Sequence, residues 1–238
     1  MAQGSRGKRQ RRHESLGKGR ARLAQILDRL HDDYAGMGTA LNFNGSFQLL
    51  VATILSAQCT DQRVNMVTPA LFARFPDPLA FVDADPLEIE KLIYTTGFFR
   101  NKTKNIQGAS NVLLRDFDGV VPGTMAELLT LPGVSRKTAN VVLSHGFARA
   151  EGIAVDTHVF RVSRRLDLSR APIPEGVEAD LMKLAPQSRW TEIADTFIWH
   201  GRQVCQARSP RCIGCKVLDL CPTGRKLTGF QFHSRENG

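Results

Sequence analysis

The chain has 238 residues, of which 42% are hydrophobic, and its formal net charge is +9. This length and composition suit one large or two modest packed domains and exclude a globally disordered chain. The longest apolar run, 47–57, is shorter than the roughly 18 residues that a membrane span requires, so we expect no membrane association.

The positive charge is concentrated at the N-terminus. Residues 1–22 contain eight Lys or Arg and a single acidic residue, whereas the remaining chain has 24 basic and 22 acidic residues. A segment with almost no apolar residues cannot bury a core, so we predict that residues 1–21 form a disordered basic arm. The arm lacks the apolar segment of a secretory signal. Its KRQRR run is typical of a phosphate-binding tail or a nuclear address, and a solubilising tail is the simpler interpretation.

Helical patterns recur along the rest of the chain, and no clear alternating pattern predicts a strand. The fold class that we predict is therefore all-α. Helices are expected at 21–30, at 46–57, from Thr60 onward, at 175–184 and at 191–204. The helix at 46–57 is almost uniformly apolar, so it should be buried, and Cys59 beyond its end is expected to be a core cysteine.

Capping residues predict where further helices begin. Asp85 and Thr124 each precede a segment with an acidic residue in its first turn, which is a common helix-start signature. Ser135 and Asp156 also carry short polar side chains that can accept hydrogen bonds from the free N–H groups of a first turn. Helices are therefore predicted to start after each of these four residues.

The cysteines form a cluster in the sequence. Four of the five lie within 205–221, at Cys205, Cys212, Cys215 and Cys221. Disulfide pairing is disfavoured because no secretory signal indicates an oxidising compartment. Structural zinc usually takes two separated C-x2-C pairs, whereas one such pair flanked by single cysteines in one short loop favours a 4Fe-4S cluster. We predict the cluster and keep zinc as the alternative.

Two arginines lie between the first two of these cysteines. Ligation of a metal cluster would fix Arg208 and Arg211 on a rigid loop. Guanidinium groups bind phosphates through paired N–H donors. We therefore expect Arg208 and Arg211 to grip the backbone of a nucleic acid.

The segment LPGVSRKTANVVL, residues 131–143, predicts a tight turn that leads into a helix. Gly133 permits the turn, and Ser135 caps a helix whose free N–H groups point outward. Such a helix end can bind an anion, and a DNA phosphate is the obvious one given the basic arm. A simple helix-turn-helix corner within the core is the alternative.

Lys137 lies within two residues of the start of that helix, where a cation is locally unfavourable. Arg136 beside it disfavours the charged form further, and a neutral amine is the form that attacks carbon to give a Schiff base. Phosphate binding is the alternative role. Asp156, nineteen residues further on, is either the N-cap of its helix or a second catalytic group. Both roles can coexist only if its side chain is exposed.

The motifs LPGVSRKTANVVL and IAVDTHVFRV, together with the four-cysteine loop, resemble endonuclease III of the helix-hairpin-helix, Gly-Pro-Asp superfamily of DNA glycosylases. The resemblance runs from about Arg22 to Pro222 and includes ILSAQCTD and IYTTGFFRNK. It implies two helical domains flanking a DNA-binding cleft. The implied divisions are a six-helix domain with the helix-hairpin-helix at 39–149, an iron-sulfur domain at 22–38 and 150–223, and a C-terminal tail at 224–238.

The resemblance implies a base-excision-repair enzyme, a bifunctional DNA glycosylase and abasic-site (AP) lyase that removes oxidised pyrimidines from double-stranded DNA. In this family the lysine that matches Lys137 attacks C1′ of the damaged nucleoside, expels the base and forms a Schiff base. β-Elimination then cuts the strand. The aspartate that matches Asp156 activates the lysine or stabilises cationic character on the sugar. Across a shared cleft, this carboxylate would favour the protonated lysine and oppose the effect of the helix end.

A base buried in a duplex must be flipped out, and the space it leaves must be filled. The resemblance assigns the filling role to Gln58, whose alternative is a helix-end amide bonded to the backbone. At Phe98 the family usually has a leucine that wedges between bases. Phe98 and Phe99 therefore form either a bulkier wedge or part of the core. Asp61 and His158 match polar positions near the pocket.

Two other functions remain open. A monofunctional adenine glycosylase would lack the lysine and usually has Asn where this chain has His158. A damage-binding module without enzymatic activity would keep the hairpin and the cluster but would not need Lys137 and Asp156 together. The preferred interpretation implies a monomer in the cytoplasm of a bacterium, associated with the nucleoid.

Overall fold

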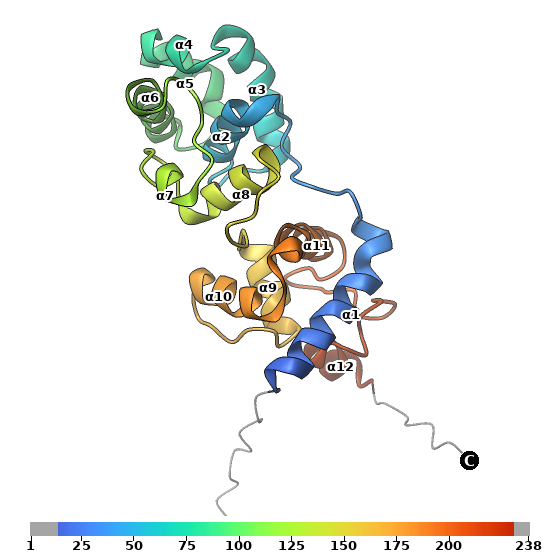
Figure 1. Cartoon of the computed structure of the whole chain (residues 1–238). Coiled ribbons are helices and arrows are strands. Elements are labelled where there is room, and N and C mark those ends of the chain that lie inside the picture. Colours follow the sequence, from blue (N-terminus) through green and yellow to red (C-terminus); the bar gives the residue numbers. More distant parts are fainter. Residues whose placement is uncertain (1–13, 231–238) are drawn as a thin grey trace, which may run out of the picture.

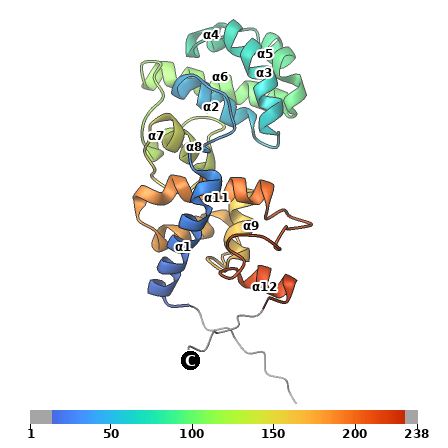
Figure 2. The same cartoon turned by 90° about the vertical axis from the view of Figure 1, so that its right-hand side faces the viewer.

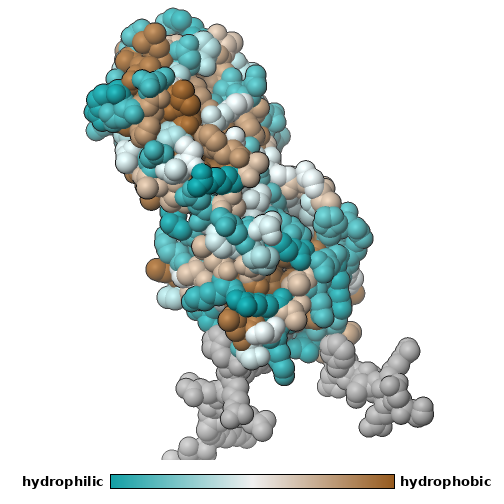
Figure 3. All heavy atoms as spheres, viewed as in Figure 1, coloured by the Kyte–Doolittle hydropathy of each residue, from teal (hydrophilic) through white to brown (hydrophobic). Residues whose placement is uncertain are grey.

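The computed structural model describes residues 14–230, which contain twelve α-helices, two short 3-10 helices and no strand. The all-α prediction is therefore confirmed for this part of the chain. Figure 1 shows the helices in two groups, one above the other. Figure 3 shows a waist between them on a face where hydrophilic and hydrophobic residues are interspersed. No helix of residues 14–230 combines the length and apolar character needed to cross a bilayer.

The upper group in Figure 1 holds the segment between residues 41 and 146. Its helices are α2 (Gly45–Leu55), α3 (Asp61–Arg74), α4 (Pro78–Asp83), α5 (Pro86–Ile93), η1 (Tyr94–Thr96), α6 (Phe99–Asp116), α7 (Met125–Leu128) and α8 (Arg136–Gly146). Their buried apolar side chains form one hydrophobic core that extends from Leu41 to Leu143. The segment has seven α-helices rather than six, and α4 and α7 are shorter than two turns.

The lower group combines the first and the last helices of the described residues. Its helices are α1 (Leu16–Tyr34), α9 (Thr157–Arg165), α10 (Pro174–Leu184), η2 (Gln187–Arg189), α11 (Trp190–Gln203) and α12 (Pro222–Thr228). A second hydrophobic core joins the apolar stripe of α1 to residues between Ile153 and Val217. The chain therefore passes between the groups after α1 and again after α8, as the side view in Figure 2 also shows.

The prediction of a disordered arm over residues 1–21 is wrong for its last six residues. Helix α1 begins at Leu16, so residues 16–21 are helical rather than part of a disordered arm. Gly19 is buried there and packs closely against Leu184, since a Cβ at this position would lie 3.0 Å from a methyl group of that residue. Arg20 donates a hydrogen bond to the Lys183 carbonyl. Packing against α10 thus extends the helix into the basic segment. Residues 1–13 of the predicted arm lie outside the described residues.

The first residues of the predicted C-terminal tail, 224–238, are helical. Residues 224–228 belong to α12, whose N-cap Cys221 accepts a hydrogen bond from the Gly224 N–H. Gly229 ends this helix in the left-handed conformation, with φ of 68°. Residues 231–238 of the predicted tail lie outside the described residues.

All four predicted helix starts are confirmed. Each capping side chain accepts a hydrogen bond from the first turn: Asp85 from Leu87 N, Thr124 from Glu127 N, Ser135 from Thr138 N, and Asp156 from His158 N and Val159 N. Two of these caps, Ser135 and Asp156, begin the helices that carry the candidate catalytic residues. The local sequence therefore determines where α8 and α9 begin, and with that the positions of Lys137 and Asp156.

Candidate active site between the two helix groups

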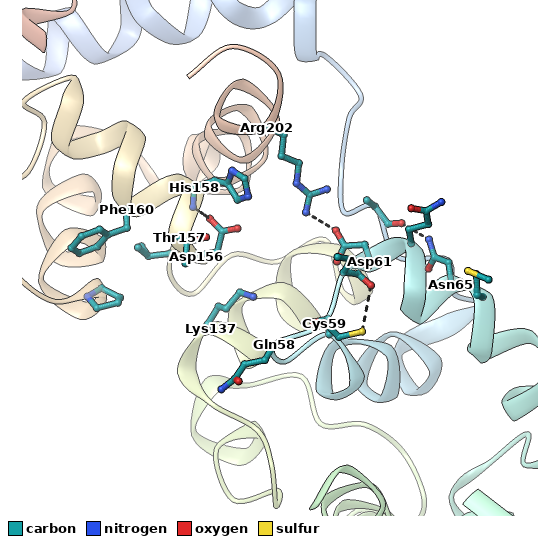
Figure 4. Close-up of a pocket in the computed structure, with 17 residues that line it drawn as sticks. Gln58, Cys59, Asp61, Asn65, Lys137, Asp156, Thr157, His158, Phe160 and Arg202 are labelled. Carbon is teal, nitrogen blue, oxygen red and sulfur yellow. Dashed lines mark hydrogen bonds and ion pairs between the residues drawn. The ribbon is translucent and has the colours of Figure 1, made fainter. Parts of the chain in front are cut away.

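A cleft of about 1280 Å³ lies between the two groups. Its lining comes from the loop between α2 and α3 and the start of α8 in the upper group, and from the starts of α9 and α10 and the end of α11 in the lower group. Lys137 lines it from α8 and Asp156 from α9, and Figure 4 shows them on facing sides. The fold therefore brings together two residues that the sequence had singled out separately.

Lys137 is the second residue of α8, and its side chain is exposed to the cleft. It makes no hydrogen bond or ion pair with any residue between 14 and 230. The neighbouring Arg136 turns away and donates hydrogen bonds of 2.6 and 3.1 Å to both carboxylate oxygens of Glu178. The Glu178 carboxylate thus offsets the repulsion that the sequence predicts between Arg136 and Lys137. Lys137 remains free to react with a ligand in the cleft.

Asp156 serves as a helix cap and lines the cleft at the same time. Its Oδ1 accepts hydrogen bonds of 2.8 Å from His158 N and Val159 N. The side chain is half-buried, and no hydrogen bond to Oδ2 is formed within the described part of the chain. The capping role is confirmed, and it leaves the second carboxylate oxygen available to the cleft, so it does not exclude the predicted catalytic role.

His158 is held in one tautomer by its neighbour. Its Nδ1 lies 3.1 Å from Arg161 Nη2, and a guanidinium only donates, so Nδ1 accepts and Nε2 carries the proton. Burial lowers the pKa of His158, Arg161 and Arg202 lower it further, and Asp156 opposes them. The imidazole is therefore neutral near pH 7 and offers an N–H donor beside Asp156.

The loop between α2 and α3 carries three consecutive cleft residues. Gln58 is exposed in a left-handed conformation, with φ of 52°, and its amide makes no hydrogen bond with the described residues. The alternative role of Gln58, a helix-end amide hydrogen-bonded to the backbone, is therefore wrong. Cys59, expected in the core, is half-buried: it packs against the upper core and also lines the cleft. Its neighbour Thr60 caps α3 by accepting from Arg63 N.

Asp61 is joined across the cleft to a residue that sequence reasoning missed. Arg202, near the end of α11, donates a hydrogen bond of 2.5 Å to Asp61 Oδ2. The guanidinium also lies 5.3 Å from the centre of the Trp199 ring. Arg202 stands three residues before Cys205, but no local pattern distinguishes it from the other arginines of the chain. It links the upper and lower groups at the cleft, as Figure 4 shows.

The two phenylalanines after Gly97 have different environments. Phe98 is 63% exposed and adopts a left-handed conformation, with φ of 47°. Phe99 is half-buried, packs against the upper core and has its ring 4.9 Å from that of Tyr94. Phe98 is therefore a surface side chain on a loop tip, whereas Phe99 belongs to the core. Phe98 is not among the residues that line the cleft itself.

The hairpin before α8 requires its glycine. Gly133 has φ of 77°, and a Cβ there would lie 2.7 Å from Asn105 Cβ. The turn therefore packs directly against α6, and Gly133 and Ser135 both remain exposed. This arrangement leaves the free N–H groups at the start of α8 open to an anion.

The four cysteines line one small cavity in the lower group: Cys205, Cys212, Cys215 and Cys221. They are free thiols, and within residues 14–230 no three His, Cys, Asp or Glu side chains are arranged to hold a metal ion. Arg165 Nη1 lies 3.3 Å from Cys205 Sγ, and Arg165 also donates to three carbonyls of the loop that follows. That loop carries Arg208 and Arg211, which are exposed and lie outside the cleft.

The chain resembles known proteins in both sequence and fold. Residues 51–187 match the family model of the HhH-GPD superfamily base excision DNA repair protein. The chain is 55% identical over 204 residues to endonuclease III of Synechocystis sp., covering 86% of this chain and 93% of that protein. It is 39% identical over 208 residues to endonuclease III of Escherichia coli, covering 87% of this chain and 98% of that protein.

Solved structures agree with this relationship. A non-covalent endonuclease III–DNA complex superimposes with a TM-score of 0.84 at 40% identity, covering 89% of this chain and 99% of that one. A trapped endonuclease III–DNA covalent intermediate gives a TM-score of 0.83 at 40% identity, covering 88% and 98%. The fold is also shared with a thermostable thymine-DNA glycosylase, with a TM-score of 0.76 at 21% identity and coverage of 90% and 100%.

Proposed function

This chain belongs to the HhH-GPD superfamily of base excision DNA repair proteins and is a DNA glycosylase and AP lyase of the endonuclease III type, and we propose that Lys137 is its nucleophile. One observation carries this assignment. Lys137 is an amine without a hydrogen-bond or ion-pair partner among residues 14–230, and it faces Asp156 across a cleft large enough for an extruded nucleotide. A damage-binding module would not need this pair.

In the proposed reaction the neutral Lys137 amine attacks C1′ of the damaged nucleoside. The carbon-nitrogen bond to the base breaks, and the base leaves with the electron pair and takes up a proton. Ring opening then gives a Schiff base between Lys137 Nζ and C1′. Loss of a proton from C2′ drives β-elimination, in which the C3′–O bond breaks and the strand is cut.

Asp156 and His158 assist from the opposite wall. The open Oδ2 of Asp156 is placed to accept a proton from the Lys137 ammonium and to stabilise positive charge that develops on the sugar. His158 is neutral and carries its proton on Nε2, so it donates a hydrogen bond to a DNA oxygen rather than acting as a base. The lower wall thus supplies oriented electrostatics, while the upper wall supplies the nucleophile.

The proposed partner is double-stranded DNA that contains an oxidised pyrimidine or an abasic site, bound by a monomer at the bacterial nucleoid. Gln58 would fill the space left by the flipped base, and Phe98 would insert from the neighbouring loop. Backbone phosphates would meet the start of α8 at Gly133 and Ser135. The proposed DNA contacts are Gln58, Asp61, Phe98, Gly133, Ser135, His158, Arg208 and Arg211. Asp61 would act by way of its hydrogen-bonded partner Arg202.

We also propose that the cysteine cavity holds a 4Fe-4S cluster. The donors are of the right chemical type, although their sulfurs are not arranged around a metal here: four free thiols line one cavity, and N–H groups of Arg165 and Gly224 contact two of the sulfurs. Burial raises the pKa of Cys215 and Cys221, so four adjacent thiolates require the positive charge of bound metal. The cluster would fix the loop that carries Arg208 and Arg211, and its role is structural because the reaction needs no electron transfer.

The test is turnover on a duplex with one thymine glycol. The wild type should release the base and cut the strand, whereas Lys137→Gln should do neither and still bind the duplex. Base release without cutting by the wild type would indicate a monofunctional glycosylase. Binding without base release would indicate a damage-binding protein, and either result would overturn the proposal.

A further inference from the structure

A buried ammonium connects the two loops that we assign to insertion into the duplex. Lys102 lies in the first turns of α6 and is 4% exposed. Its Nζ donates hydrogen bonds of 2.8 Å to the Leu55 carbonyl and 2.9 Å to the Thr96 carbonyl. These carbonyls belong to segments that are 41 residues apart in the chain. The reaction as described above makes no use of this side chain.

Each of these carbonyls ends the element that precedes an insertion residue. Leu55 is the last residue of α2 and stands three positions before Gln58, and Thr96 is the last residue of η1 and stands two positions before Phe98. Both insertion residues are exposed, non-glycine and left-handed, with φ of 52° and 47°. Such conformations carry a steric cost and persist only where the surrounding structure holds them.

Lys102 is suited to holding both loops. Helix α2 leaves carbonyls at its C-terminus without intrahelical partners, and a cation is favourable there. The Lys102 backbone N–H also donates to the Phe98 carbonyl at 3.0 Å, so side chain and backbone of one residue contact both loops. Burial lowers the pKa of Lys102, while nearby Cys59 opposes that shift. An apolar residue of similar length would leave the Leu55 and Thr96 carbonyls without this donor.

We propose that Lys102 is a positioning residue that fixes the spacing between Gln58 and Phe98, so that the two side chains enter the duplex as one unit. This inference rests on the proposed function, because it concerns the step that opens the base pair. A stacked duplex tolerates insertion only at defined positions, and a misplacement of about 1 Å far from the chemistry can cost on the order of 100-fold in rate. Lys102 would therefore affect base extrusion rather than attack at C1′.

The first test compares Lys102→Met with the wild type on two substrates under single-turnover conditions. One is a duplex with thymine glycol opposite adenine, and the other carries the lesion opposite a gap, where no partner base must be displaced. We expect Lys102→Met to slow cleavage of the paired lesion by on the order of 10- to 100-fold and of the gapped lesion by less than about threefold. Lys104→Met, which alters an exposed lysine on the same helix, should resemble the wild type on both.

The ratio of the two rates within one preparation is independent of how much protein is folded. An unchanged ratio for Lys102→Met would overturn the inference, because a purely structural lysine would affect both substrates alike. A fluorescent adenine analogue opposite the lesion supplies a second reading: its emission should rise when the wild type binds and not when Lys102→Met binds. If the wild type cleaves neither substrate, the proposed function fails instead.

A second test keeps Lys102 intact. Gln58→Ala and Phe98→Ala alter exposed loop residues and should leave the fold unchanged. If both side chains act as one unit, their effects on paired-lesion cleavage should be non-additive, and the double variant should be little worse than the poorer single variant. Strictly additive effects would show that the two loops act independently and would overturn the inference.

Discussion

The side chains that we propose to act on the nucleotide are held differently on the two walls of the cleft, although Thr60 and Asp61 of the upper wall are also hydrogen-bonded. On the lower wall Asp156, His158 and Arg202 are each tied by hydrogen bonds to neighbouring groups. On the upper wall Gln58 and Lys137 make no side-chain hydrogen bond with residues 14–230, and both are exposed. The difference separates two tasks. Fixed groups preorganise the electrostatics that a developing charge meets, whereas free groups are available to contact and attack the nucleotide.

The anchored wall is tested most strongly at Asp156. Asn at this position retains an oxygen that can cap α9, so we expect Asp156→Asn to keep its melting temperature within a few degrees. The loss of the carboxylate should lower single-turnover base release by about 10²- to 10⁴-fold, as is typical of removing a general acid or base. Calorimetry measures the melting temperature, and quenched-flow kinetics measure the rate of base release. An Asn variant with full activity would show that the lower wall only shapes the cleft.

The upper wall depends on an anchor of its own. Glu178 on α10 is buried and bonds Arg136, Asn140 Nδ2 and Ile153 N, so it joins α10 to α8 directly beside Lys137. Glu178→Gln should lower the free energy of unfolding by about 1–3 kcal/mol, since Arg136 is 40% exposed and solvent moderates the loss. Chemical denaturation measures this change. Glu175→Gln, at an exposed position in the first turn of the same helix, is the comparison and should cost clearly less, because Glu175 acts on Arg136 without a hydrogen bond.

A smaller effect is expected from His158 as the pH falls. Its pKa is lowered in the folded protein, so the unfolded chain binds a proton first as the pH drops below about 6.5. The stability contributed by neutral His158 is therefore fully present above that pH and is lost as the pH approaches the folded pKa. Melting temperatures between about pH 7 and pH 5 should fall more steeply for the wild type than for His158→Gln. Parallel curves would show that the imidazole is not held neutral.

The smallest effect concerns the loop outside both walls. Arg208→Ala and Arg211→Ala should each weaken DNA binding alike on all sequences and reduce the salt dependence of affinity by about one unit of slope. Lys183→Ala removes the same charge from α10 and should leave the slope unchanged. Affinity measured across a salt series distinguishes these outcomes. Slopes that match the wild type would remove Arg208 and Arg211 from the DNA interface.

Local features of the molecule were predictable from sequence because they depend on few residues. The caps require short polar side chains, which Ser135 and Asp156 supply, and the turn requires a positive φ, which Gly133 adopts readily. These residue types can be recognised in the sequence. Helix α6 was not anticipated, because its buried face includes the polar residues Lys102, Thr103 and Ser110, which interrupt the apolar pattern. Burial of polar groups depends on partners that sequence spacing does not reveal.

The parts of the site that the sequence did not predict also depend on partners far away in the chain. The Arg136–Glu178 pair spans 42 residues and the Asp61–Arg202 pair spans 141, so neither leaves a local signal. The expected effect of Arg136 on Lys137 was incomplete for the same reason, since its carboxylate partner lies on another helix. Cys59 was expected in the core from the apolar helix before it, but the loop that follows opens into the cleft. Long-range contacts decide these environments.

The most direct test of the account is borohydride trapping on a duplex with one thymine glycol, followed by mapping of the modified residue. We expect the wild type to form a covalent adduct at Lys137, and Lys137→Gln, folded and bound to the same duplex, to form none. An adduct on another lysine, or one that persists in Lys137→Gln, would contradict the assignment of the nucleophile.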